Sequence, residues 1–371
     1  MTWDHPRGYD PLVACSAVWE GRTGVRVEWD RRSLQDFESF PVTELAERYD
    51  LIVIDHPHVG QITREQCLVP LDDEADVALL RSDYVGASLA SYEWKGKLWA
   101  LPIDAAAQVQ AWRPDRLESP PLDWREMLEL ATAGAVLCPL RPPHNLMALF
   151  TLCGLSGSPV RAEGPELLPP AGAIVAYELL RELTARIDRG CLAMDPIAVL
   201  ERMSQTDCAC VSSPLIYGYV SYSRRAGGPA GARAAIAFGD LMPLLSGTAP
   251  TGSALGGTGI AVSARSAHRR AALEFAHWVA GREAQRGPYV AAGGQPASAA
   301  AWEDPEANAA SLDFYRNTRA TLESAWLRPR HAGYMRFQHA AAERLLRGLE
   351  SGEPAAGVIA AVNRLFQGVS S

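Results

Sequence analysis

Two short polar segments carry side chains that could do chemistry in this sequence. The tripeptide Asp-His-Pro occurs at residues 4–6, in MTWDHPRGY, and again at residues 55–57, in YDLIVIDHPHVGQ. Each copy follows a short apolar run, so each is expected where a strand ends. Because ligands of open α/β sheets bind beyond the carboxyl ends of the strands, we expect both copies on the rim of one cleft. Turn formation alone also explains the pattern, since Asp and Pro are frequent in turns.

The histidines of these segments have two chemical interpretations. His56 and His58 are two residues apart, so in an extended segment both side chains would point to one side. With His5, and with Asp4 or Asp55, they would complete the divalent metal site of a metal-dependent enzyme. We favour the other interpretation, in which the histidines hydrogen-bond to a ligand, and we expect neither a metal nor a cofactor.

Known catalytic motifs are missing from the sequence. No G-x-S-x-G, Walker A or H-E-x-x-H pattern occurs, and GGTG lacks the strand and helix that flank a dinucleotide-binding loop. The seven cysteines are scattered and odd in number, which is typical of buried reduced thiols rather than of a disulfide framework. The sequence therefore predicts a protein that binds without catalysis.

Composition narrows the classes of partner and the location. The chain has 371 residues, of which 48% are hydrophobic and 21% charged, and its length predicts two domains. Its net charge of −8 argues against a nucleic-acid binder, because such proteins neutralise phosphates with Lys and Arg. No run approaches the ~18 apolar residues of a membrane span. No signal peptide is recognisable, so we expect a cytoplasmic protein, or a periplasmic one if a leader has been removed.

The hydrophobic pattern predicts strands that alternate with helices. An amphipathic helix is expected over 11–20, a strand over 25–29, and a buried parallel strand over 51–54. Asp123 and Glu126 are spaced like a capping box and open a helix. A loop is expected over 224–233, and the alternation predicts an α/β fold with mostly parallel sheets. Apolar residues share one helical face in two further sets, which are Leu179, Leu180, Leu183 and Ile187, and Val358, Val362 and Phe366.

Several longer stretches carry a family resemblance. The segment YEWKGKLWALPIDAAAQVQAWRPD, at 92–115, resembles the Gly-Lys-aromatic-small-Leu-Pro segment and crossing strand of family 1 extracellular solute-binding proteins. YDLIVIDHPHVGQ and the later CLVPLDD resemble the family's Asp-containing strand and its Leu-x-Pro-Leu-Asp turn, and PLDWREMLELA resembles its Pro-x-Thr-Trp-x-Glu helix start. GGTGIAVSARSAHRRAALEFAHWVAGREAQRGPYVAAGGQPA resembles its late strand, helix and closing Gly-x-x-Pro. The matches follow the family's order and cover most of the chain.

The resemblance implies an α/β, two-lobed type II periplasmic-binding-protein-like fold with a ligand cleft at the hinge. Lobe 1 would comprise 1–104 and 256–302, and lobe 2 would comprise 105–255 and 303–371. The chain would cross between the lobes from Ile103 onward and return at Gly256 and Gly257. The family consists of ABC-transporter substrate-binding proteins that close by a hinge motion. A permease is therefore the expected partner if the chain is exported, and the chain itself is expected to be a monomer.

Side chains from both lobes would line this cleft. Sugar sites combine polar groups that fork around hydroxyls with aromatic faces, and the sequence offers both. Gly8 and Gly60 are expected to form tight turns in the two rim loops. The predicted ligand-binding residues are Trp3, His5, Arg7, Gly8, Tyr9, Asp55, His56, His58, Asp104, Tyr217, Tyr219, Gly256, Gly257, Arg328 and Arg330.

The class of ligand has two interpretations. Aromatic rings beside Asp and His predict a sugar or a related carbohydrate, although Tyr217 and Tyr219, in SSPLIYGYVSY, also fit plain strand alternation. Arg7, Arg328 and Arg330 instead indicate a cytosolic binding protein or sensor for an anionic metabolite. Such a ligand would be an organic acid, a sugar phosphate or a CoA-type thioester, because arginine pairs with carboxylates and phosphates.

Overall fold

The computed structural model of the chain describes residues 1–33, 41–72, 82–162, 164, 166–224, 233–244 and 249–369. Its strands are β1 (Thr2–Trp3), β2 (Arg31–Arg32), β3 (Leu51–Ile54), β4 (Glu93–Trp94), β5 (Lys97–Leu98), β6 (Leu101–Trp112), β7 (Ser212–Tyr217), β8 (Ala237–Gly239) and β9 (Leu255–Val262). Its α-helices are α1 (Pro6–Thr23), α3 (Val42–Ala46), α4 (Val59–Glu65), α6 (Ser88–Ser91), α7 (Trp124–Thr132), α8 (His144–Leu155), α9 (Pro170–Thr184), α10 (Pro196–Ser204), α11 (Arg269–Ala280), α12 (Arg282–Ala284), α13 (Ala299–Trp302), α14 (Pro305–Ala309), α15 (Phe314–Glu323), α16 (Tyr334–Ser351) and α17 (Ala355–Gln367). Short turns of other helix types are η1 (His56–His58), η2 (Arg189–Ala193), η3 (Val220–Tyr222) and η4 (Gln285–Tyr289).

The central sheet has the strand order β3-β9-β6-β7, with β8 also paired to β6. Within the described ranges, β1 and β2 are the only strand pair that runs parallel, so the prediction of mostly parallel sheets is wrong. Residues 51–54 do form a fully buried strand, β3, but it pairs antiparallel with β9. A continuous apolar run reports burial on both faces, whereas the direction of pairing depends on the path of a partner about 200 residues away.

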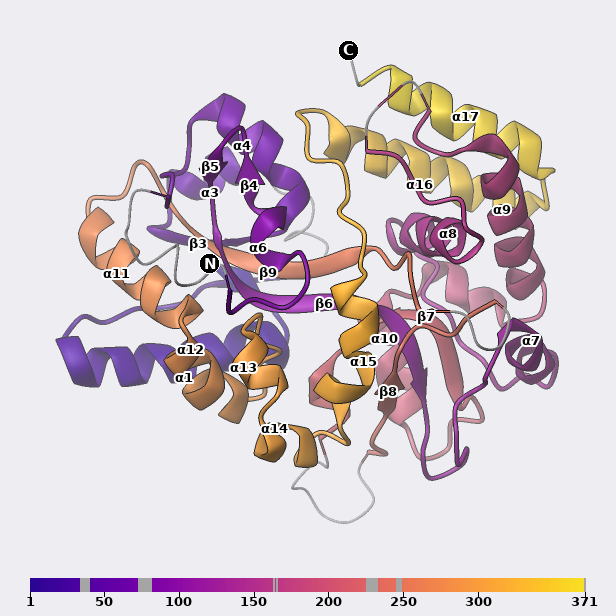
Figure 1. The fold of residues 1–371 in the computed structure, drawn as a ribbon, viewed down its shortest axis with the longest axis horizontal. Helices are drawn as coiled ribbons and strands as arrows, with labels where there is room; N and C mark the ends of the chain where they lie inside the picture. Colours follow the sequence, from indigo (N-terminus) through magenta and orange to yellow (C-terminus); the bar gives the residue numbers. More distant parts are fainter. Residues whose placement is uncertain are drawn as a thin grey trace.

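Strand β6 joins the two halves of the molecule. Its first residues, from Leu101 to Ala107, pair with β9, and its last residues, from Gln108 to Trp112, pair with β7 and β8. Figure 1 shows β6 and β9 running across the middle, with α1, α3, α4 and α11 on one side and α7, α8, α9, α16 and α17 on the other. These two long strands therefore carry residues of both halves to the centre.

The chain start folds beside β3. The Val53 N–H donates to the Met1 carbonyl, and β1 pairs with β2 on its other edge. Residues 25–29 form no strand, contrary to the prediction, although Val25 and Val27 pack against the core. The free edge of β1 pairs with β2 instead. The Trp29 indole donates to Ser16 of α1 at 2.9 Å.

The predicted helices are largely confirmed. The helix expected over 11–20 is α1, which extends to both sides of that range. Asp123 caps α7 by accepting from the Glu126 N–H at 3.1 Å, as its spacing predicts. The predicted apolar face of α17 is buried, whereas on that of α9 Leu180 and Leu183 are buried, Leu179 is partly buried, and Ile187 lies beyond the end of the helix. Most of the loop expected over 224–233 lies outside the described residues.

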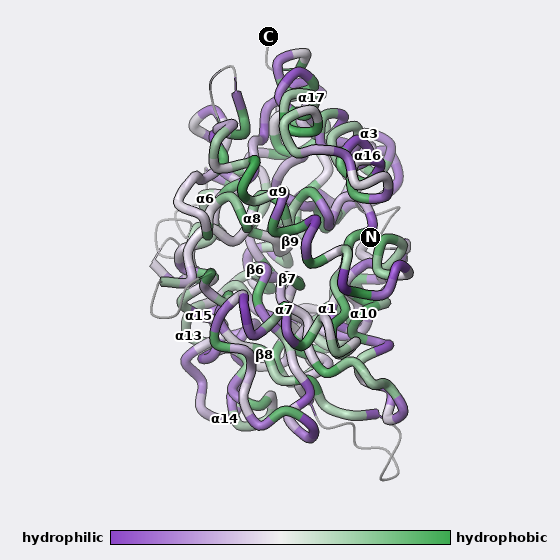
Figure 2. Tube along the Cα trace, turned by 90° about the vertical axis from the view of Figure 1, so that its right-hand side faces the viewer, coloured by the Kyte–Doolittle hydropathy of each residue, from purple (hydrophilic) through white to green (hydrophobic). Residues whose placement is uncertain are grey.

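Hydrophobic side chains form two cores. The first surrounds the β3–β9–β6 part of the sheet with α1 and α11, and the second lies among α7, α8, α9, α16 and α17. In Figure 2, α16 and α17 alternate between hydrophobic and hydrophilic colour along their turns, which is the pattern of helices with one buried face. The predicted boundaries assign α10, β8 and α15 to lobe 2, and side chains of all three belong to the first core. The lobe boundaries therefore stay a prediction.

Candidate functional site

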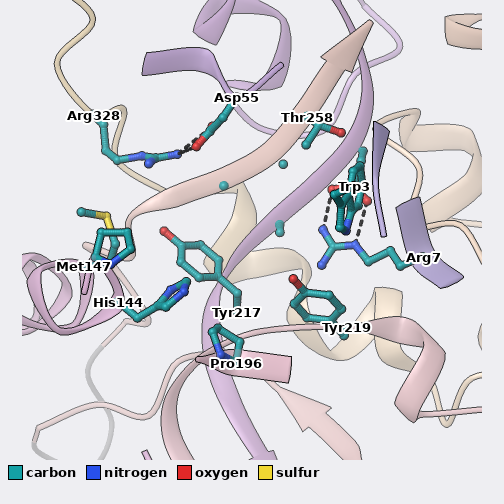
Figure 3. A pocket seen from close by; sticks show the side chains of 15 residues that line it. Trp3, Arg7, Asp55, His144, Met147, Pro196, Tyr217, Tyr219, Thr258 and Arg328 are labelled. Carbon is teal, nitrogen blue, oxygen red and sulfur yellow. Dashed lines mark hydrogen bonds and ion pairs between the residues drawn. The ribbon is translucent and has the colours of Figure 1, made fainter. Parts of the chain in front are cut away.

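A cavity lies where β3, β6, β7 and β9 meet the starts of α1, α8 and α10 and the segment that precedes α16. Its volume is about 80 Å³. Nine of the predicted ligand-binding residues line the cavity: Trp3, Arg7, Asp55, Asp104, Tyr217, Tyr219, Gly256, Gly257 and Arg328. They come from both halves of the molecule, and Figure 3 shows most of their side chains.

One wall of the cavity holds a buried ion pair between α1 and β6. The Arg7 guanidinium donates from Nε to Asp104 at 2.8 Å, and its Nη2 donates to the second carboxylate oxygen. Nη1 donates to the Gly218 carbonyl at 2.8 Å, and the guanidinium lies 4.4 Å from the centre of the Tyr219 ring. Burial opposes the charge on Arg7, but the neighbouring Asp104 carboxylate outweighs it and raises the pKa of Arg7. Arg7 is therefore a fixed cation whose position is set by three contacts.

A second ion pair lines the same cavity. Nη2 of Arg328 lies 2.8 and 2.7 Å from the two carboxylate oxygens of Asp55, which directly follows β3. Arg328 also donates from Nη1 to Gln338 of α16 at 3.3 Å. Burial alone would raise the pKa of Asp55, but Arg328 and the His56 imidazole, whose Nδ1 lies 3.2 Å from the carboxylate, hold it well below its usual range. Both groups are thus charged, and the pair connects β3 to the segment before α16.

The remaining wall comes from α8 and the strand end of β7. Figure 3 shows the Tyr217 side chain in the middle of the cavity lining, with His144 and Met147 beside it. The rings of His144 and Tyr217 meet edge to face, with 6.4 Å between their centres. Burial lowers the pKa of His144 from 6.5 to about 4, so this imidazole is neutral near pH 7.

Three buried polar atoms of the lining lack a hydrogen-bond partner within the described chain. They are Thr258 Oγ1, Arg328 Nε and His144 Nδ1, and each comes from a different element. A buried polar group without a partner costs about 1–3 kcal/mol. A polar solute bound in the cavity would supply hydrogen-bond partners to these three groups, so their presence marks the cavity as a binding site for such a solute.

Three predicted residues near the chain start lie outside the cavity lining. His5 caps α1 by accepting from the Arg7 N–H at 3.1 Å, and its ring meets Tyr219 edge to face. Gly8 lies inside α1 rather than in the predicted turn, and a Cβ there would come within 2.2 Å of the Trp3 ring, which accounts for a glycine at this position. The Arg31 guanidinium lies over the Tyr9 ring, 4.5 Å from the centre of that ring. These residues support the wall formed by Trp3, Arg7 and Tyr219.

Three further predicted residues also lie outside the lining. His56 and His58 are buried in the turn η1, and the His56 ring faces Tyr92 edge to face. Arg330 donates from Nη1 to the backbone carbonyls of residues 90, 91 and 93, at 2.6 to 3.1 Å. Gly60 lies in α4 rather than in the predicted turn, and the Arg330 carbonyl takes the place of its missing Cβ.

The metal interpretation finds no support in this geometry. In the ranges that the structure describes, no three His, Cys, Asp or Glu side chains gather closely enough to hold a metal ion. The ring of His5 packs on Tyr219, whereas that of His56 packs on Tyr92. Among the cysteines, six are buried, as the sequence predicts, and Cys210 is partly exposed.

Sequence reasoning missed six residues of the lining. Ala106 and Thr258 follow Asp104 and Gly256 by two positions, so strand alternation would have placed them on the same face. The other four come from the starts of α8 and α10, where no motif points to a site. The missed residues are Ala106, Pro143, His144, Met147, Pro196 and Thr258.

Solved structures share this fold at low sequence identity. The maltose-bound MalE3 of T. maritima superposes with a TM-score of 0.81 at 16% identity, over 96% of this chain and 95% of that one. A solute-binding protein of Agrobacterium radiobacter K84 in complex with ribitol gives 0.76 at 17%, over 97% and 96%. The Thermus thermophilus maltotriose binding protein gives 0.74 at 17%, over 100% and 98%. The predicted two-lobed type II periplasmic-binding-protein-like fold is therefore confirmed.

Sequence comparison identifies the family. No curated protein matches the chain. The described helices include none that is long and apolar enough to cross a membrane. The family model for bacterial extracellular solute-binding proteins matches residues 20–312, which is most of the chain, and the resemblance found in the sequence is confirmed. The chain therefore belongs to the bacterial extracellular solute-binding protein family.

Proposed function

We propose that this protein binds a small carbohydrate-type solute in the cavity and catalyses no reaction on it. The observation that supports this most is the presence of two Arg–Asp pairs, Arg7 with Asp104 and Arg328 with Asp55, on one cavity. A hydroxyl group both donates and accepts, so it can donate to the carboxylate and accept from the guanidinium of the same pair. Trp3 and Tyr219 add aromatic surface to the lining, and aromatic surface packs well against the C–H side of a sugar.

The solved structures that share the fold agree with this class of ligand. The three described above hold maltose, ribitol and maltotriose, all of which are polyhydroxylated and uncharged. A receptor of Streptomyces glaucescens that also shares the fold, with a TM-score of 0.78, was solved with acarbose. These ligands support a carbohydrate-type solute here.

The cavity arginines favour a second candidate, which is an anionic metabolite such as an organic acid, a sugar phosphate or a CoA-type thioester. Guanidinium groups pair readily with carboxylates and phosphates. Such a ligand would have to take the place of Asp104 at Arg7 or of Asp55 at Arg328.

The family also indicates a partner. We propose that the bound solute is handed to an ABC-transporter permease, as the membership in a solute-binding family supports. The family is described as extracellular, and the cytoplasmic location expected from the sequence stays a prediction. The lobe boundaries at 104, 255 and 302, and the monomeric state, also stay predictions.

Thermal-shift screening tests the function. A carbohydrate at 100 times its dissociation constant should stabilise the protein by about 2.7 kcal/mol, which raises the melting temperature measurably. Arg7→Met should abolish the shift, whereas Arg22→Met, at the exposed pair with Glu283, should keep it. If no sugar or polyol shifts the melting temperature, the proposed function is wrong. A shift that survives in Arg7→Met would place the ligand elsewhere.

A further inference from the structure

The cavity carries no net charge, although it contains four ionised groups. Each of its two guanidinium groups is held against one carboxylate, at Arg7 with Asp104 and at Arg328 with Asp55. His144 adds no charge, because burial lowers its pKa to about 4 and keeps the imidazole neutral near pH 7. A ligand therefore meets no excess of positive or negative charge among these groups.

This balance disfavours a charged ligand. An anion could contact a guanidinium fully only by displacing the carboxylate that already holds it. The Asp104 side chain has no solvent exposure, and that of Asp55 has 15%. The displaced carboxylate would stay buried without a counter-charge, which is among the most costly arrangements in a protein. A hydroxyl group displaces nothing, because it can bind beside the pair.

The volume of the cavity limits the length of the ligand. That volume is only about 80 Å³. So small a space favours one sugar ring or one short polyol over a trisaccharide.

The two ion pairs lie on different sides of the Tyr217 ring. Figure 3 shows Arg328 with Asp55 on one side and Arg7 with Tyr219 on the other. Thr258 faces the same space. A molecule with hydroxyl groups at both ends can reach both pairs at once.

We infer that the cavity selects a single uncharged sugar unit or short polyol, and that it rejects both the phosphorylated form of that molecule and longer oligosaccharides. This inference rests on the proposed function and adds the charge and the size of the ligand to it. Its specificity determinants are the carboxylates of Asp55 and Asp104, which occupy the arginines that an anion would need.

Calorimetric titration with matched compounds tests the inference. The purified protein is titrated with ribitol, D-glucose, D-galactose and D-xylose, with a phosphorylated form of each, and with maltose and maltotriose. At least one of the four uncharged single units should bind. Its phosphate should bind at least about 100-fold more weakly, because a buried carboxylate would lose its partner. Maltotriose should also bind more weakly than the single unit.

The possible outcomes separate the inference from the proposed function. Tighter binding of a sugar phosphate would overturn the charge selection, and tighter binding of maltose or maltotriose would overturn the size limit, while both leave carbohydrate binding intact. If no uncharged compound of the series binds, the proposed function fails and the inference fails with it.

Asp55→Asn provides the sharper test of the charge selection. It releases Arg328 from its carboxylate, so the preference for each uncharged compound over its phosphate should fall by at least 10-fold. Asp115→Asn is the matched control, because Asp115 pairs with Arg113 through two hydrogen bonds outside the cavity lining. An unchanged preference in folded Asp55→Asn would overturn the inference. Should that variant fail to fold, Asp104→Asn removes the equivalent carboxylate on the other side.

Discussion

Nη2 of Arg328 lies 2.8 and 2.7 Å from the two carboxylate oxygens of Asp55, although 273 residues separate them along the chain. Asp55 follows β3, and Arg328 precedes α16, whose Gln338 accepts from the same guanidinium. One ion pair thus connects the first core to the helices of the second core, on the wall of the proposed binding cavity.

Replacing one partner of this pair should destabilise the fold. Arg328→Met leaves the Asp55 carboxylate buried without its counter-charge, which costs about 3–5 kcal/mol of unfolding free energy. Adding Asp55→Asn should recover part of that loss, because no uncompensated charge remains. Urea denaturation measures both. Arg270→Met, at the exposed pair with Glu274, is the control and should leave the denaturation midpoint unchanged. Equal effects at the two arginines would contradict the buried pair.

Acidification should destabilise the protein through three buried histidines. Burial lowers the pKa values of His5, His56 and His144 to about 4, from about 6.5 in the unfolded chain. Between these values the unfolded state binds more protons, so the free energy of unfolding falls as the pH drops from about 6.5 to about 4. Each histidine contributes up to about 3 kcal/mol to this loss.

The variant His144→Gln should make the pH dependence shallower by roughly one third. Asp195, Arg141 and Arg328 are the charged groups that act on this imidazole, and all of them remain in the variant. Denaturation at pH 7, 6, 5 and 4.5 measures the slope. His268→Gln, at an exposed position, should retain the slope of the wild type. If both variants keep it, His144 does not titrate as described.

Adding one methyl group at Gly60 should be harmful, even though the residue is helical. A Cβ there would lie 1.8 Å from the carbonyl oxygen of Arg330, which is a backbone atom of the segment before α16. Gly60→Ala should therefore cost about 1–3 kcal/mol through overpacking. Gly21→Ala, in α1 with nothing near its Cβ, should instead gain about 0.5–1 kcal/mol. Thermal denaturation of both variants checks this opposite pair of signs.

Gln295 should matter for stability. Its amide donates to the Ala105 carbonyl at 2.7 Å and accepts from the Val220 N–H at 3.0 Å, so it joins the neighbours of Asp104 and Tyr219. Gln295→Leu leaves two buried backbone groups unpaired, at about 1–3 kcal/mol each. Chemical denaturation measures the loss, and Gln367→Leu, on the exposed side of α17, should cause none. An unaffected variant would show that water replaces the amide.

Local patterns predicted the elements, because their causes lie within a few residues. The cap at Asp123, the apolar face of α17 and the burial of Leu51–Ile54 depend on side chains one or two turns apart, and each is present in the structure. The family resemblance predicted the overall fold, through motifs that occur in order along the chain.

The tertiary structure alone decided which polar residues face the cavity. His5 and His56 each lie within two residues of a cavity residue in the sequence. In the structure, however, His5 caps α1, and His56 is buried against Tyr92. The direction of β3, and the roles of His144 and Pro196, also depend on segments that are distant in sequence. The sequence by itself determined the residue types of the site, the helices and the burial of β3. Which arginine meets which aspartate is a matter of long-range packing, because a charge enters the interior only where its partner arrives from elsewhere in the chain.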